Sequence, residues 1–111
     1  MKAFVTGVGG QLGHDVMDEI AKRGYEGIGS DILPSVESSY PYVQLDITDA
    51  SAVEKAISEV KPDVVVHCAA WTAVDAAEDE ENMAKVKAIN VDGTQNIANV
   101  CKKLDCKMIY I

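Results

Sequence analysis

The stretch Thr6-Gly7-Val8-Gly9-Gly10-Gln11-Leu12-Gly13 decides the fold of this chain of 111 residues. It follows a short apolar run over residues 3–5 and precedes a segment in which apolar residues recur at every fourth position. That spacing, at Leu12, Val16 and Ile20, predicts a helix over residues 11–23 with these side chains on one face. A strand, a glycine-rich turn and a helix in this order form the opening of a βαβ unit.

Three of the glycines are spaced as GxxGxxG, and each has a physical purpose. Gly7 permits a tight turn off the strand, Gly10 lets the backbone approach a pyrophosphate, and Gly13 lets the helix pack closely on the sheet. Free N–H groups and the positive dipole end of the helix would bind the anion. The spacing therefore predicts a dinucleotide-binding turn, and the alternative is a plain strand–helix connection. The sequence has no GxxxxGK[ST] motif, which excludes an ATP-hydrolysing P-loop.

The rest of the chain continues the alternation of strands and helices. Further strands are predicted over 25–30, 42–45, 64–66 and 107–111, a loop over 31–41, and helices from Asp49 to about residue 60 and over 82–104. The buried residues expected on these two helices are Val53, Ile57, Val60, Val86, Ile89, Ile97 and Val100. Strands that alternate with helices imply right-handed crossovers and a parallel sheet. We therefore predict an α/β fold with one domain over 1–111, a Rossmann-type doubly wound parallel sheet of five strands in the order 3-2-1-4-5 with helices on both faces.

Composition and charge restrict the function. Hydrophobic residues make up 48% of the chain, which is typical of a globular protein, and 18 acidic residues against 10 basic ones give a net charge of −8. This excess of acid argues against nucleic acid and anionic membrane as partners. The three cysteines form no CxxC, which argues against a disulfide framework and a structural zinc site. With no signal peptide pattern at the N-terminus, the expected location is cytoplasmic.

Asp31 lies at the end of the second predicted strand, 21 residues after Gly10. An acidic residue at this point can accept hydrogen bonds from an adenosine ribose. Its charge would repel a 2′-phosphate, and no Arg follows it in the loop, so the electrostatics favour NADH, or the use of both cofactors, over strict use of NADPH. The alternative is a solvated loop carboxylate.

Asp46 and Ile47 close the third predicted strand, where they can border an adenine. The alternative for Asp46 is helix capping, since both Asp46 and Asp49 precede the second helix.

The segment from His67 to Trp71 leaves the fourth strand at the change in strand order, where ligands bind in such folds. The small Ala69 and Ala70 permit close approach of a cofactor. For His67 and Cys68 we favour core filling at the end of the strand over a catalytic role. Trp71 either caps a pocket or fills a gap.

Two further features lie between this segment and the last helix. The acidic run Asp75, Glu78 and 79–81 is interpreted as a solvated helix start, with a Mg²⁺ site as the alternative. Asn90 and Gly93 within a helix cost about 1 kcal/mol each relative to Ala, which indicates close packing or a polar contact there.

Together these residues resemble the extended short-chain dehydrogenase/reductase family, and within it the dTDP-4-dehydrorhamnose reductases. The matching pieces are the glycine turn, Asp31, Asp46-Ile47, the string from His67 to Glu78, and Asn90-x-x-Gly93-Thr94. The resemblance implies that Gly10-Gln11-Leu12 holds a pyrophosphate, Asp31 a ribose, Asp46-Ile47 the adenine side, and Ala70-Trp71-Thr72 the nicotinamide half.

The reaction implied by the resemblance is reduction of dTDP-6-deoxy-L-lyxo-4-hexulose to dTDP-L-rhamnose with NADH or NADPH. The family's catalytic Ser or Thr follows the fifth strand, and its Tyr-x-x-x-Lys pair comes later. None of the four tyrosines in this chain has a Lys four residues on. We therefore expect no catalytic residues here, but the cofactor-binding part of a longer chain whose substrate domain is absent. The exposed edge over 107–111 makes association into a homodimer an expected partner state.

Two other functions fit the same motifs. One is a nucleotide-sugar epimerase or dehydratase of the extended family. The other is a non-catalytic dinucleotide-binding regulatory subunit, because the regulatory subunit of methionine adenosyltransferase is similar in this region.

Overall fold

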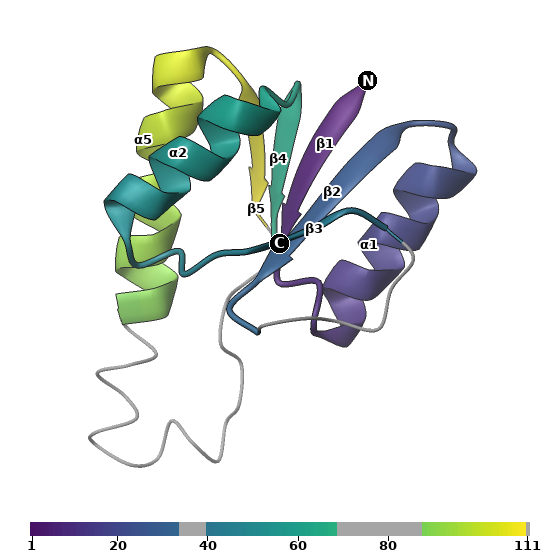
Figure 1. Cartoon of the computed structure of the whole chain (residues 1–111), viewed down its shortest axis with the longest axis horizontal. Coiled ribbons are helices and arrows are strands. Elements are labelled where there is room, and N and C mark those ends of the chain that lie inside the picture. Colours follow the sequence, from purple (N-terminus) through teal and green to yellow (C-terminus); the bar gives the residue numbers. More distant parts are fainter. Residues whose placement is uncertain (34–39, 69–87, 111) are drawn as a thin grey trace.

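The computed structural model describes residues 1–33, 40–68 and 88–110, except for the side chains of 88–90. Five parallel strands form one sheet in the order β3-β2-β1-β4-β5, which confirms the predicted topology (Figure 1). The strands are β1 (Lys2–Thr6), β2 (Glu26–Asp31), β3 (Tyr42–Gln44), β4 (Val64–His67) and β5 (Lys107–Tyr110). The helices are α1 (Gln11–Lys22), α2 (Ala50–Val60), the π-helix η1 (Ala88–Gly93) and α5 (Thr94–Leu104).

Helices cover both faces of the sheet. On one face, α1 packs Met17 against Val5 and Val66, and Val16 and Ile20 adjoin the same cluster. On the other face, α2 and α5 lie side by side over β1 and β4 (Figure 1). Both sides of the central strands are therefore dry, as the continuous apolar run over 64–66 predicts.

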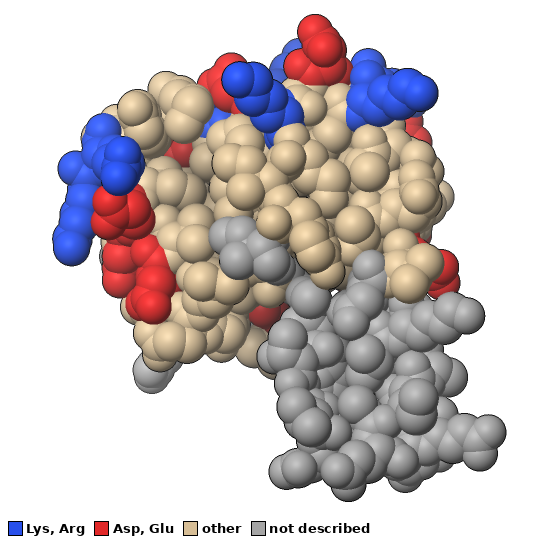
Figure 2. Space-filling view, turned by 180° about the vertical axis from the view of Figure 1, so that it is seen from behind, with Lys and Arg blue, Asp and Glu red and all other residues tan. Residues whose placement is uncertain are grey.

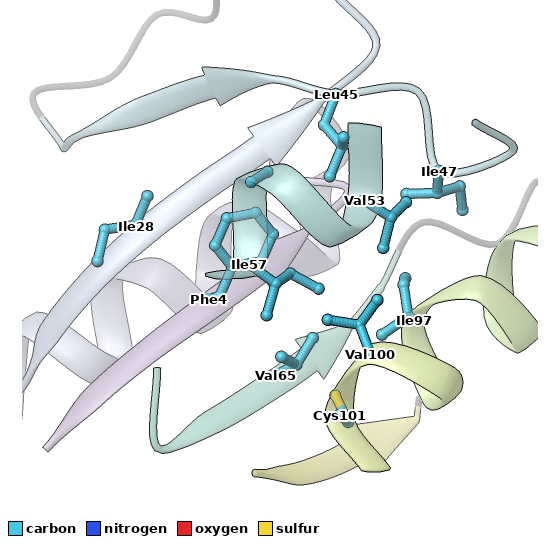
Figure 3. Close-up of a cluster of buried hydrophobic side chains, with 11 residues drawn as sticks. Phe4, Ile28, Leu45, Ile47, Val53, Ile57, Val65, Ile97, Val100 and Cys101 are labelled. Atoms are coloured by element: carbon cyan, nitrogen blue, oxygen red, sulfur yellow. The ribbon is translucent and has the colours of Figure 1, made fainter. Parts of the chain in front are cut away.

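The larger of the two cores lies under α2 and α5. Phe4, Val65, Val53, Ile57 and Ile97 are fully buried there (Figure 3). Val53 and Ile57 come from one stripe of α2, and Ile97 and Val100 come from one stripe of α5, as their spacing predicts. This cluster packs the two helices against the strands.

Two predictions about the helices need correction. Leu12 is 48% exposed, because the first turn of α1 extends past the strand ends, and Met17 takes the buried place instead. The last helix is not a uniform α-helix, since its described part begins as the π-helix η1. That wide turn includes Gly93, where a Cβ would lie 2.5 Å from Cδ1 of Ile47, so the predicted close packing at Gly93 is confirmed.

The register of the strands brings four residues into one row at the carboxyl edge of the sheet. Thr6 pairs with Ser30 on one side and with His67 on the other, and His67 pairs with Tyr110. Strand β5 forms the outer edge beyond β4, with Ile109 and Tyr110 more than half exposed. Association through this edge stays a prediction.

Charged side chains are unevenly placed on the surface. On the face opposite to the view of Figure 1, Lys and Arg lie toward the end where the strands begin, and the centre carries no charge (Figure 2). Within the described ranges, no helix is long and apolar enough to cross a membrane.

Candidate functional site

The glycine turn between β1 and α1 is pinned to the end of β2. Gly7 has a φ of +78°, a conformation in which a side chain would be strained, so its predicted turning role is confirmed. The N–H groups of Gly7 and Val8 both donate to the carbonyl of Ser30, over 2.8 and 3.2 Å. The chain thus leaves the sheet and enters α1 within four residues.

Gly13 and Gly10 serve different needs. A Cβ on Gly13 would lie 2.2 Å from the carbonyl oxygen of Gly7, so only glycine lets α1 pack this closely against the turn. A Cβ on Gly10 would meet only that same oxygen, at an ordinary 3.6 Å. The protein itself therefore does not require glycine at position 10, and the free space there is open to a ligand.

The first turn of α1 has no internal cap. Gly10 occupies the N-cap position and supplies no side chain, and the first turn carries no acidic residue. The N–H groups of Gln11, Leu12 and Gly13 have no acceptor within a helix at this position. They and the helix dipole form an anion-binding end. Gln11 and Leu12 are exposed beside it, and the Gln11 amide donates to Asp15 over 2.9 Å.

Asp31 faces the same turn. Its Oδ2 accepts the N–H of Gly9 over 2.9 Å, and its Oδ1 accepts the N–H of Ile32 over 2.8 Å. Oδ1 also accepts the N–H of Leu33 over 3.4 Å, so the oxygen with a lone pair left for a further bond is Oδ2. Asp31 is therefore not a freely solvated loop carboxylate, and it is held beside the glycine turn as the motif spacing predicts.

Gly9 makes close contacts at this site that the GxxGxxG spacing does not predict. A Cβ there would lie 2.9 Å from Oδ2 of Asp31 and 2.8 Å from the side chain of Leu33. Gly9 lies between Gly7 and Gly10 of the spaced motif. The sequence signal that could have found it is that the cluster contains one glycine more than the GxxGxxG spacing requires.

The segment after Asp31 is held by β3. The Tyr42 hydroxyl donates to the carbonyls of Asp31, over 3.0 Å, and of Leu33, and the Gln44 amide donates to that of Ile32. Burial, with a smaller effect from the charge of Asp31, raises the pKa of Tyr42, which therefore remains a donor at neutral pH. Sequence spacing gave no sign of these contacts, since they join residues nine to twelve positions apart across a loop.

A pocket of about 200 Å³ opens at the carboxyl edge of the sheet between these groups. Its lining combines the turn, the end of β2, the segment after β3 and the residue after β4. The lining residues are Thr6, Gly7, Gly10, Ser30, Asp31, Ile32, Leu45, Asp46, Ile47 and Cys68. Among these described residues there is no Lys or Arg, so an anion would be recognised by backbone N–H groups.

Asp46 and Ile47 both line this pocket. Oδ1 of Asp46 accepts from the N–H and the hydroxyl of Thr48, over 2.9 and 2.6 Å. The helix cap is Asp49 alone, whose side chain accepts the N–H of Ala52 over 3.1 Å. The capping alternative therefore holds for Asp49 and is wrong for Asp46.

His67, at the end of β4, connects three elements. It is fully buried, and its Nδ1 lies 2.7 Å from the hydroxyl of Thr6 while its Nε2 lies 2.9 Å from the hydroxyl of Thr94. Burial lowers the pKa of His67, which is therefore neutral at physiological pH. The core-filling prediction for His67 is confirmed, and its two hydrogen bonds join β1, β4 and α5.

Cys68 lies at the rim of the pocket. Its N–H donates to the Thr6 hydroxyl over 3.0 Å, and it packs half-buried against the cluster under α1. Burial raises the pKa of its thiol, so Cys68 is protonated at neutral pH and is a poor nucleophile. Core filling is thus only partly right for Cys68, since it also lines the pocket.

The remaining predicted site residues fall outside the described part of the chain. These are Ala69, Ala70, Trp71, Thr72 and the acidic run over 75–81. Within the described ranges, no group of three or more His, Cys, Asp or Glu side chains could hold a metal ion.

Comparison with known proteins gives concordant results. The family model described as "RmlD substrate binding domain" matches residues 1–111. The chain is 36% identical to a dTDP-4-dehydrorhamnose reductase of Streptomyces griseus over 108 residues, which is 97% of this chain and 32% of the relative. It is 37% identical to that of Mycobacterium tuberculosis (strain ATCC 25618 / H37Rv) over 110 residues, 99% of this chain and 32% of the relative.

A solved structure shares the fold. The UDP-glucose 4-epimerase of Thermus thermophilus, determined in complex with NAD, superposes with a TM-score of 0.86 at 27% identity over 97% of this chain and 36% of that one. The chain spans about a third of the length of the curated relatives it matches. Since the family model matches the whole of it, the chain belongs to the RmlD substrate binding domain family.

Proposed function

We propose that this chain is the dinucleotide-binding part of an NAD(P)H-dependent reductase. The proposed reaction reduces the 4-keto group of dTDP-6-deoxy-L-lyxo-4-hexulose and yields dTDP-L-rhamnose. One observation carries the proposal: the uncapped N-terminus of α1 and the fixed carboxylate of Asp31 face one pocket at the carboxyl edge of the sheet. The identity to named reductases supports the choice of reaction.

Each end of the pocket would bind a different part of the cofactor. The N–H groups of Gln11, Leu12 and Gly13 would bind the pyrophosphate, which approaches over the open face of Gly10. Asp31 would accept hydrogen bonds from the adenosine ribose, and Asp46 and Ile47 would border the adenine. The reduced nicotinamide, when bound, supplies the hydride. In our proposal its half of the site is formed by residues 69–72.

The catalytic groups lie outside these 111 residues in this proposal. Reduction of a ketone needs a proton donor and a hydroxyl that polarises the carbonyl, and the loss of an acid alone costs about 10² to 10⁴ in rate. The chain has no Tyr-x-x-x-Lys pair. Its domain is therefore proposed as the cofactor-binding unit of a longer cytoplasmic enzyme, which also binds the sugar nucleotide.

The electrostatics of the pocket favour NADH. Asp31 is held beside the glycine turn, where we propose that the ribose binds, and no Lys or Arg stands among the described lining residues to pair with a 2′-phosphate. Two like charges about 4 Å apart near a protein surface repel by a few kcal/mol.

The preference can be tested in the protein that carries this chain. Asp31→Ser is expected to move the ratio of affinities toward NADPH by about tenfold, or roughly 1.4 kcal/mol. Asp49→Ser is the matched control, because it removes one carboxylate outside the pocket and keeps a capping oxygen. Calorimetric titration with NADH and NADPH gives both ratios. A strict preference for NADPH in the parent, or an equal shift in both variants, would contradict this assignment.

The reaction itself needs a separate assay. The proposed reductase consumes one equivalent of NADH for each 4-keto sugar nucleotide reduced. An epimerase would interconvert sugar nucleotides with no net loss of NADH. A regulatory subunit would bind the dinucleotide and a protein partner with no turnover, so the three functions give three different results.

A further inference from the structure

Helix α5 ends in a hydrogen-bonded motif that places two side chains against each other. Asp105 adopts the left-handed conformation, with a φ of 55°. The N–H of Cys106 donates to the carbonyl of Cys101 over 2.9 Å, and that of Asp105 donates to Lys102 over 3.4 Å. These two bonds define a Schellman motif, which brings the third residue from the helix end into contact with the second residue beyond it.

Both residues at these positions are cysteines. Cys101 is 3% exposed within the core under α2 and α5, and Cys106 packs half-buried against the same core (Figure 3 shows Cys101). Neither thiol is in a disulfide, and both side chains pack against the same core. Burial, with a smaller effect from the neighbouring Cys106, raises the pKa of Cys101 to about 12.

We propose that Cys101 and Cys106 form a dithiol modification site, which small-molecule disulfides oxidise to an intramolecular disulfide. The helix-ending motif joins the backbones of the two residues through a 2.9 Å hydrogen bond, and a disulfide needs such proximity, with Cα atoms roughly 4.4–6.8 Å apart. Both side chains pack against the same core. The proposal does not depend on the function of the pocket.

The order of the two steps follows from exposure. The thiolate of the more accessible Cys106 attacks one sulfur of the small disulfide, releases one thiolate and forms a mixed disulfide. Cys101 then loses its proton and attacks the Cys106 sulfur, which releases the second thiolate. Two protein thiols are oxidised and one small disulfide is reduced to two thiols. Cys101 is a poor first nucleophile because its thiol holds its proton.

The site lies away from the pocket. Strand β5 begins at Lys107, which pairs with Val64 at the start of β4, whereas the pocket lies where the strands end. Cys68 is the control cysteine for this chemistry. It is half-buried like Cys106, but it follows the end of β4, whereas Cys106 precedes the start of β5.

Peptide mapping of the protein that carries this chain tests the proposal. The folded protein is treated with 2,2′-dithiodipyridine, residual thiols are blocked with N-ethylmaleimide under denaturing conditions, and trypsin is added without reduction. Trypsin cuts after Lys102 and Lys103, between the two cysteines. A disulfide therefore links peptides 88–102 and 104–107, and dithiothreitol separates them.

The variants assign the chemistry to this pair. We expect the linked peptides in the parent and in Cys68→Ser, and their loss in Cys106→Ser, where Cys101 is recovered blocked by N-ethylmaleimide. In Cys101→Ala, Cys106 should carry a stable thiopyridine group. The proposal is overturned if the parent carries two separate thiopyridine groups at Cys101 and Cys106, or if both are recovered with N-ethylmaleimide. The measurement on the parent needs no variant to fold.

Discussion

Helices α1 and α2 both begin at the carboxyl edge of the sheet, but they treat their first N–H groups differently. Helix α2 has a side-chain N-cap, since the carboxylate of Asp49 accepts the N–H of Ala52. Helix α1 begins at Gly10, which offers no acceptor. A side-chain cap contributes about 1 kcal/mol, so α1 gives up that stability and keeps its donors available. An open helix end beside a carboxylate is thus the clearest sign of function in this structure.

The largest effect should come from closing the space at the start of α1. Gly13→Ala would place a Cβ 2.2 Å from the Gly7 carbonyl, and the helix or the turn must shift. We expect a loss of about 3 kcal/mol in the free energy of unfolding, at the upper end for overpacked sites. Thermal and denaturant unfolding measure it. An unchanged stability would show that the turn yields easily.

Next in size is the effect of filling the open side of Gly10. Gly10→Val should fold, because the backbone there is extended (φ −91°, ψ 166°) and a Cβ finds ordinary space. Its β-branch would stand where the pyrophosphate approaches, so dinucleotide affinity should fall by about 100-fold, or roughly 2.7 kcal/mol. Calorimetry compares it with Gly10→Ala, which should lose less. Equal affinities in parent and Gly10→Val would remove the case for a ligand at this helix end.

At the start of α2 we expect a loss of stability without a loss of dinucleotide affinity, the reverse of the result expected at Gly10. Asp49→Ala should lower the free energy of unfolding by about 1 kcal/mol through loss of the cap. Dinucleotide affinity should not change, since Asp49 does not line the pocket. Asp49→Ser restores a capping oxygen and should recover the stability. A loss of affinity in Asp49→Ala would mean that α2, too, serves the ligand.

The smallest expected effect is a pH-dependent change in stability caused by His67, which contacts Thr94 at the start of α5. Burial lowers the pKa of His67 in the folded protein, so the unfolded chain binds a proton first as pH falls below about 6.5. Stability is full above that pH and decreases below it. Between about pH 6.5 and 5.5 the parent should lose up to about 1 kcal/mol more than His67→Asn. Unfolding curves at several pH values measure the difference, and parallel pH profiles would contradict it.

Local rules predicted most of the fold because the chain obeys them almost everywhere. The four-residue spacing on α2 and α5 and the apolar run of β4 each specify one buried face, and the topology follows from their order. Leu12 broke the rule, since a helix that extends beyond its sheet exposes apolar residues of its first turn. Burial at an element's end depends on where its neighbours stop, which periodicity does not encode.

The site was only partly predictable for a similar reason. Asp31 and the spaced glycines were found because they share one short motif with fixed spacing. The contacts of Gly9, Tyr42 and Ser30 were missed, because each joins segments distant in sequence through a backbone N–H or carbonyl, which no spacing motif specifies. The choice between Asp46 and Asp49 as the helix cap likewise needed the geometry, since both residue types suit either position.

The bond between Gly9 and Asp31 has a kinetic consequence. It fixes the turn and the carboxylate in place before any ligand arrives, so binding need not immobilise them. The conformational entropy that these two residues lose on association is then small. Association should proceed without a slow ordering step, and related dinucleotides should differ chiefly in how long they stay bound. The hydrogen bond from the Gly9 N–H should thus make the protein discriminate between dinucleotides by their dissociation rates rather than by their association rates.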